Sequence, residues 1–211
     1  MKPTRPTGGD IADTVNVSTD NLPLHCLLQS VRMKIADKVV TEGNNLYPFR
    51  ALLEKLLKYE AEVMKTRLKC ERYEEDVSLA DTNPATAGAN TGVKAREAMF
   101  NNSKVVRLSG RMQTDLWHQE KLITPRLKLD VQLVPARAAF FTKTADPGNR
   151  AAQVQYNYHI MSARFLIQFK ELSTEMVSSH REMVKTENKN YITPITKVSM
   201  KTLNNLSGGT S

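Results

Sequence analysis

The chain has 211 residues and a formal net charge of +8; 40% of its residues are hydrophobic and 25% are charged. This is an ordinary globular composition, and the chain is long enough to bury a core in one large or two small domains. No apolar run approaches the roughly 18–20 residues of a membrane-spanning helix, and the N-terminus lacks the apolar segment of a secretory signal. We therefore expect a protein of the cytosol or nucleus that does not contact a membrane.

The residue types that carry chemistry show no catalytic or ligand-binding spacing. Cys26 and Cys70 are far apart and form no C-x-x-C pair, so we expect two reduced, buried thiols. The four histidines are His25, His118, His159 and His180. None has a second His or Cys at metal-ligand spacing, and the glycine patterns of phosphate-binding loops are missing. We predict no catalytic, cofactor-binding or metal-binding residue, no cofactor, and no enzymatic activity.

The clearest helix signal follows Pro48, a residue that suits the first turn of a helix. A stripe of apolar residues at helical spacing comes next, at Phe49, Leu52, Leu53, Leu56 and Leu57. The spacing predicts an amphipathic helix that ends near residue 59 and packs its leucines on a core. A second helical stretch continues to about residue 75.

A two-residue period dominates much of the remaining chain. It is cleanest at Leu127, Leu129, Val131 and Leu133, which alternate with polar residues and predict a half-buried antiparallel strand. A slip in the alternation near residues 28–31 predicts a bulge or a short helical turn before another strand. Further strand signals lie at 31–35, 39–40, 105–108, 140–142, 156–160, 165–169 and 191–202.

These signals define a domain organisation. Residues 1–20 are poor in apolar side chains and are expected to be a loop or disordered lead-in. Residues 21–202 are expected to form a mainly β sandwich with helical insertions near 48–75, 93–101 and 174–188. Residues 80–92 read as a loop, because small residues, Pro84 and two glycines disfavour regular structure there.

Four segments carry a family resemblance. They are Leu22–Val31, with Leu-Pro-Leu-His-Cys-Leu; Asn44–Tyr59, with Asn-Asn-Leu-Tyr-Pro-Phe-Arg-Ala; Leu108–Ile123, with Gly-Arg-Met-Gln-Thr-Asp-Leu; and Leu127–Phe141, with a strand and Arg-Ala-Ala-Phe-Phe. In this order they resemble segments of the double jelly-roll major capsid proteins of Maverick/Polinton-type elements and adintoviruses. Two departures from the family pattern are Trp117-His118, in place of Phe-Asn, and Phe49, in place of Tyr.

The resemblance implies a fold, a function and partners. It implies a jelly-roll β-sandwich, with 21–202 as most of a first jelly roll, incomplete at both ends, and 203–211 as the start of a connection to a second. It implies a virion structural protein that forms trimers and tiles an icosahedral shell around double-stranded DNA. A minor capsid protein and weak DNA contact are possible further partners, with assembly in the host nucleus or cytoplasm.

Two other classes of function stay open. The charge of +8 is compatible with a basic nucleic-acid-binding module, although the cations are scattered and no run of five basic residues occurs. A capsid-derived host protein with a new interaction role is the other alternative. The sequence does not separate it from a viral gene.

Overall fold

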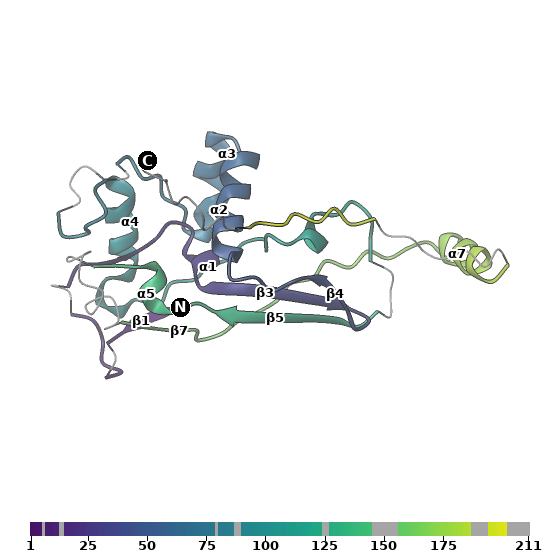
Figure 1. Ribbon diagram of the computed structural model, residues 1–211, viewed down its shortest axis with the longest axis horizontal. Helices are drawn as coiled ribbons and strands as arrows, with labels where there is room; N and C mark the ends of the chain where they lie inside the picture. The colour runs from purple at the N-terminus through teal and green to yellow at the C-terminus, as the bar shows by residue number, and fades with distance from the viewer. Residues whose placement is uncertain are drawn as a thin grey trace, which may run out of the picture.

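The computed structural model describes residues 1–5, 7–12, 15–78, 80–86, 90–123, 127–144, 156–186 and 194–201 (Figure 1). Its β-strands are β1 Lys2–Thr4, β2 Val17–Thr19, β3 Leu28–Ile35, β4 Lys38–Thr41, β5 Leu129–Pro135, β6 Thr142–Thr144 and β7 Asn157–His159. Its α-helices are α1 Pro23–Cys26, α2 Tyr47–Lys58, α3 Ala61–Thr66, α4 Thr91–Phe100, α5 Ala138–Phe141 and α7 Thr174–Thr186. Short 3-10 helices are η1 Arg67–Glu71, η2 Asn101–Ser103 and η3 Asp115–His118.

The prediction of a jelly-roll sandwich is wrong. The described strands form three separate antiparallel sheets, with two strands in β1-β7, two in β2-β6 and three in β4-β3-β5. A sandwich needs two larger sheets packed face to face. The segments 105–108, 160–172 and 194–201 alternate as expected of strands but join no described sheet. Any extended chain can carry alternating apolar and polar side chains, whereas a sheet also requires a neighbouring strand to hydrogen-bond with.

The three-stranded sheet carries the main core. β3 lies between β4 and β5, and its register pairs Val31 with Leu133 and Met33 with Val131. Val31, Met33 and Val131 pack with Tyr47, Ala51 and Leu116 into one hydrophobic cluster, whereas Leu133 is exposed. The strands predicted at 127–133, 31–35 and 39–40 are therefore confirmed. The slip near residue 28 has two causes, the helical turn α1 and a register shift between Leu28 and Ser30.

The lead-in differs from its prediction. Residues 1–20 contain β1 and β2, which pair with β7 and β6, more than a hundred residues further along the chain. All three residues of β2 are buried. Such short strands carry too little apolar periodicity to be seen in the sequence, because their stability comes from distant partners. Residues 203–211, the expected start of a connection to a second domain, lie outside the described residues.

The predicted helical insertions are confirmed as helices: α2, α3 and η1 cover the first, α4 the second and α7 the third. α2 and α3 stand on one side of the three-stranded sheet, and α4 lies beside the two-stranded sheets at the other end of the molecule (Figure 1). The strand expected at 140–142 is instead the short helix α5 followed by β6. Residues 80–86 hold no helix or strand, as predicted for that part of the loop.

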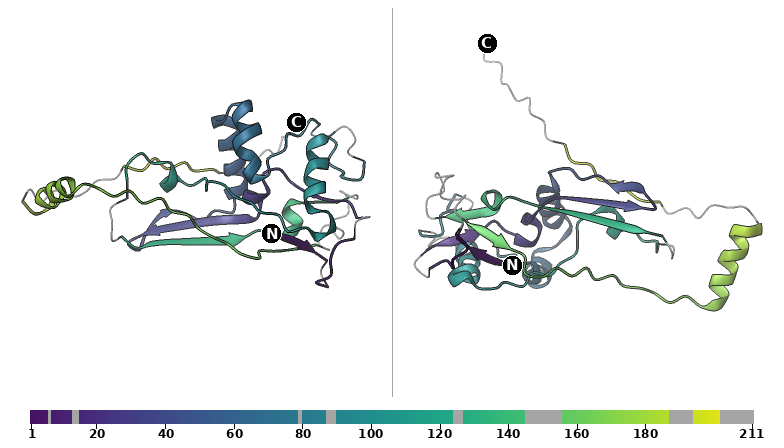
Figure 2. Two further views of the ribbon diagram at one scale, coloured as in Figure 1. Left: turned by 180° about the vertical axis from the view of Figure 1, so that it is seen from behind. Right: turned by 90° about the horizontal axis from the view of Figure 1, so that it is seen from below.

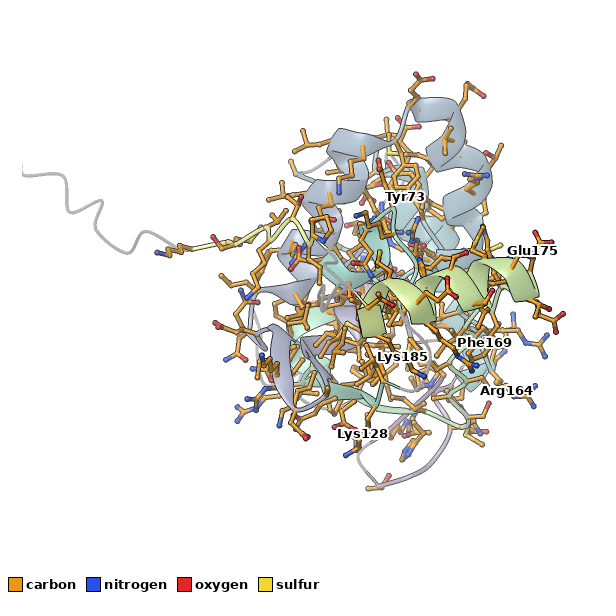
Figure 3. All side chains as sticks on the ribbon, turned by 90° about the vertical axis from the view of Figure 1, so that its right-hand side faces the viewer. Tyr73, Lys128, Arg164, Phe169, Glu175 and Lys185 are labelled. Atoms are coloured by element: carbon orange, nitrogen blue, oxygen red, sulfur yellow. The ribbon has the colours of Figure 1, made fainter. Side chains whose placement is uncertain are left out.

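Residues 160–186, here called the arm, project from the body. They run out as an extended chain from β7 and end in α7, beyond the far end of the sheet (Figures 1 and 2). Every residue of the arm is exposed except Val177 and Met183, which are half-buried. Trp117 of the body touches the arm, with its ring 5.3 Å from that of Phe165. Figure 3 looks along the molecule onto α7, with Glu175 and Lys185 at opposite ends of the helix.

Candidate functional site: a buried polar network beneath α2

The helix α2 faces the body with its polar side, which reverses the sequence prediction. Ala51 and Lys55 are 0% and 1% exposed, whereas Leu53 and Leu57 are 47% and 83% exposed. Of the predicted apolar stripe, only Leu52 packs on a cluster, beside Leu22 and Leu68. The other four side chains form an exposed surface, here called the outer stripe: Phe49, Leu53, Leu56 and Leu57.

The polar face of α2 is buried because its charged side chains meet acidic partners in the body. Ala51 has the smallest side chain on the helix and lets the backbone approach β3 closely. Around it, the long charged side chains of α2 reach acidic partners supplied by η1 and η3. A buried charge is tolerated only when it is paired and hydrogen-bonded. The partners come from segments distant in sequence, so the helix pattern alone could not reveal them.

One half of the network centres on His25, which is 1% exposed. Its Nδ1 lies 2.9 Å from the hydroxyl of Tyr47, and its Nε2 lies 3.1 Å from a carboxylate oxygen of Glu71. Lys55 Nζ lies 2.5 Å from the same carboxylate. With Nε2 protonated, His25 donates to Glu71 and its Nδ1 accepts from the Tyr47 hydroxyl. A neutral imidazole beside one ion pair then satisfies every group.

The other half centres on Arg50. Its Nε donates to Glu54 at 2.8 Å, one helical turn further on, and its Nη2 donates to Asp115 of η3 at 2.5 Å. Asp115 also accepts from the backbone N–H of Val198, in the segment 194–201. Ile195 of that segment packs against the main core. The Arg50 half of the network therefore connects α2, η3 and the segment 194–201.

Burial and pairing shift the pKa values of these groups in definite directions. Desolvation lowers the pKa of His25 below 6.5, and the hydrogen bond to Glu71 only partly opposes it. For Glu71, burial raises the pKa, but His25 and Lys55 outweigh it and the net pKa lies below 4.5. Burial raises and Arg50 then lowers the pKa of Glu54, again with a net decrease. The network thus holds neutral histidine and ionised carboxylates.

The chemistry open to this network is limited by access. A histidine hydrogen-bonded to a carboxylate is the arrangement of a general base and its orienting group. Here, however, both histidine nitrogens are occupied by protein partners and the ring is buried. The grooves found on the described surface are lined elsewhere, one near Tyr73 and Gly92 and one near Arg137 and Tyr158. The arrangement suits a rigid structural element better than a reaction centre.

The remaining chemistry-bearing residues do not converge. His118 lies 4.0 Å from Glu54 and is part-exposed, and His159 hydrogen-bonds the Thr4 hydroxyl at 3.0 Å. Cys70 is exposed rather than buried, which corrects the prediction for that thiol. Cys26 is half-buried, and desolvation raises its pKa to about 12, which keeps it a thiol at neutral pH.

Arg96 is a buried residue that the sequence analysis missed. It is 2% exposed, and its guanidinium donates to the carbonyls of Thr19 and Glu74, each at 2.9 Å. It also pairs with Asp76 at 2.6 Å. No acidic residue lies three or four positions from Arg96, so the sequence of α4 offers it no partner at helical spacing. The partners lie on β2 and on the segment after η1, so only the fold brings them within reach.

Neither a metal-ion site nor a membrane-spanning helix occurs among the described residues. In the described ranges, no group of three or more His, Cys, Asp or Glu is placed to hold a metal ion. None of the described helices combines the length and the apolar character needed to cross a bilayer. A comparison of the chain with protein-family models, with curated proteins and with solved structures finds no significant match.

Proposed function

We propose that this chain is a structural, self-associating protein of the kind represented by the major capsid proteins of Maverick/Polinton-type elements and adintoviruses. It would act through its surfaces, as a trimeric building block of an icosahedral shell around double-stranded DNA. A minor capsid protein and weak contact with DNA belong to the same proposal. Its site of action would be the virion, after assembly in the nucleus or cytoplasm of the host.

One observation carries this proposal. His25, Tyr47, Arg50 and Asp115 stand at matching positions in three of the four segments that resemble the capsid proteins. In the fold these side chains meet in one buried network. The resemblance therefore falls on residues that hold the body together, and this supports a shared structural element rather than chance similarity of separate strings.

The distribution of polar and apolar side chains supports an interaction role. His25 and the charged groups of its network are buried and paired, while large apolar side chains of α2 and the arm are exposed. Contiguous exposed apolar surface in a folded protein commonly marks contacts with other macromolecules. A shell protein needs such surfaces and no reaction centre.

The direct test is the assembly state of the purified chain. Light scattering coupled to size exclusion, followed by electron microscopy, should show defined oligomers, with trimers as the building block. A monomer at all concentrations would overturn the proposal.

A nucleic-acid-binding module is the second candidate, favoured by the net charge of +8. Several of its cations are already paired with acids, including Lys55, Arg96 and Lys143. Affinity for short duplex DNA, measured at two salt concentrations, separates the candidates. A dedicated nucleic-acid-binding protein should bind with a submicromolar dissociation constant, and its affinity should fall steeply as the salt concentration rises. The capsid proposal expects weak binding.

A further inference from the structure

Two helices, α2 and α7, each leave most of an apolar face exposed among the described residues. The outer stripe of α2 follows the pattern i, i+4, i+7, i+8 from Phe49 to Leu57. The stripe of α7 follows i, i+1, i+7, i+8, at Met176, Val177, Met183 and Val184. Each stripe matches the width that an amphipathic helix normally buries against another element.

The two faces are far apart within one molecule. α7 lies beyond the end of the sheet on the arm, and α2 rises from the middle of the body, in every view (Figures 1 and 2). Leu57 is 83% exposed on α2, and Met176 and Val184 are 52% and 50% exposed on α7. Phe49 packs its ring against that of Phe140, with ring centroids 5.7 Å apart, and stays 46% exposed.

We propose that α7 of one molecule packs antiparallel on the outer stripe of α2 in a second copy of the chain. This inference rests on the self-association in the proposed function and names the surface that would bring it about. Because each chain supplies one donor helix and one acceptor helix, the contact joins two different surfaces, and three molecules can pass their arms around a closed ring.

The exposed apolar area is large enough for such a contact. The side chains of the arm that are at least two-fifths exposed are Ile160, Met161, Phe165, Leu166, Ile167, Phe169, Leu172, Met176 and Val184. Together with the outer stripe they present on the order of 1,000 Å², taking 150–250 Å² for a complete large aromatic side chain. Most of this area lies on residues 160–172, so the extended part of the arm packs along the second copy as well as α7. A stable interface needs about 800 Å² from each partner.

Reach and charge favour the same arrangement. The extended part of the arm, residues 160–172, spans on the order of 40 Å at about 3.3 Å per residue, enough to carry α7 to a neighbour. Antiparallel packing brings Lys58, in the basic last turn of α2, to Glu175, in the acidic first turn of α7. Lys58 also pairs with Glu54 at 3.2 Å, but its side chain is 52% exposed and can face a second carboxylate. Figure 3 shows Glu175 at the end of α7, with Phe169 on the chain leading to it.

Charge substitutions test the contact. Leu57→Glu and Met176→Glu each place a carboxylate in the proposed seam, and each should weaken self-association by about tenfold or more. Both side chains are exposed, so the fold should survive. Val105→Glu is the matched control, because Val105 is 65% exposed and lies outside both stripes. Sedimentation equilibrium of the full chain gives the affinities.

Cross-linking then identifies the occupant. In a Cys70→Ser background, Leu57→Cys protein is mixed with Met176→Cys protein under mild oxidation, and the expected product is a mixed disulfide dimer. A mixture with Val105→Cys in place of Leu57→Cys should yield little. A double variant that cross-links only within one chain would show that α7 folds back on its own α2, and would overturn the inference.

The outcomes separate the inference from the proposed function. Oligomers that are unaffected by Leu57→Glu and Met176→Glu would overturn this contact while leaving self-association intact. A chain that stays monomeric at every concentration would overturn both, and the two stripes would then serve a different partner.

Discussion

Arg50 of α2 and Asp115 of η3 form a buried ion pair across 65 residues of sequence, with Nη2 2.5 Å from Oδ1. Their side chains are 9% and 5% exposed. The pair connects α2 to η3, whose Leu116 lies in the main hydrophobic cluster. It also joins two of the segments that resemble capsid proteins. The free energy lost when this ion pair is broken therefore reports how strongly α2 is held to the rest of the body.

Breaking this pair should strongly destabilise the protein. Asp115→Asn leaves the Arg50 guanidinium buried with only Glu54 as a charged partner, and we expect a loss of about 3–5 kcal/mol in the free energy of unfolding. Urea denaturation followed by circular dichroism measures it. Asp130→Asn is the control, because Asp130 pairs with Lys128 on the surface and should change the free energy by about 1 kcal/mol or less. Equal effects of the two substitutions would contradict the structural role.

The reversed orientation of α2 predicts opposite effects for two neighbouring positions. Leu53→Ala should change the free energy of unfolding by less than about 1 kcal/mol, because the side chain is half exposed. Ala51→Leu should destabilise by about 1–3 kcal/mol, because it adds bulk where α2 meets β3. Thermal and urea unfolding of both variants decide the question. A large loss for Leu53→Ala with tolerance of Ala51→Leu would mean that the leucine stripe faces the core.

Gly110 should not tolerate a side chain. A Cβ at this position would overlap the Glu71 side chain, which cannot move aside without leaving His25 and Lys55. We expect Gly110→Ala to destabilise by about 1–3 kcal/mol. Gly9→Ala is the matched control, since its nearest neighbour would be the Thr7 hydroxyl at 4.0 Å. Comparable unfolding midpoints for the two variants would show that Glu71 is free to rearrange.

The buried histidine makes stability depend on pH. Because the pKa of His25 is lowered in the fold, the unfolded chain binds the proton more readily, so stability is complete above about pH 6.5 and falls as pH drops toward the folded pKa. The lowered pKa values of Glu71 and Glu54 have the same sign and act below about pH 4.5. The protein should therefore lose stability progressively on acidification.

His25→Gln isolates the histidine contribution. This variant should be less stable at pH 7.5 but should show a flatter profile between pH 7.5 and 5, measured by urea unfolding. His118 also has a pKa lowered by burial, but its side chain is 23% exposed, so His118→Gln should remove a smaller part of the slope. A wild-type profile in the His25→Gln variant would locate the acid sensitivity elsewhere.

Local patterns predicted the elements better than their arrangement. The helix after Pro48 and the strand near residues 129–133 were both recognisable, because their periods of 3.6 and 2 are properties of the local chain. The arm shows where this reasoning ends. Phe165, Ile167 and Phe169 alternate like a strand, yet the segment joins none of the sheets among the described residues, because pairing depends on a neighbour that alternation cannot supply.

The sequence by itself determined the helices near 48–75, 93–101 and 174–188 and the strands near 31–35, 39–40 and 129–133. It also determined the lack of catalytic spacing and the resemblance that motivates the proposed function. The tertiary structure alone decided which side of α2 is buried. Hydrophobicity favoured the leucine face, but Arg50 and Lys55 found Asp115 and Glu71 on segments 16 to 65 residues away. The side that docks is set by the sum of all contacts, and ion pairs between distant segments exist only once the chain has folded.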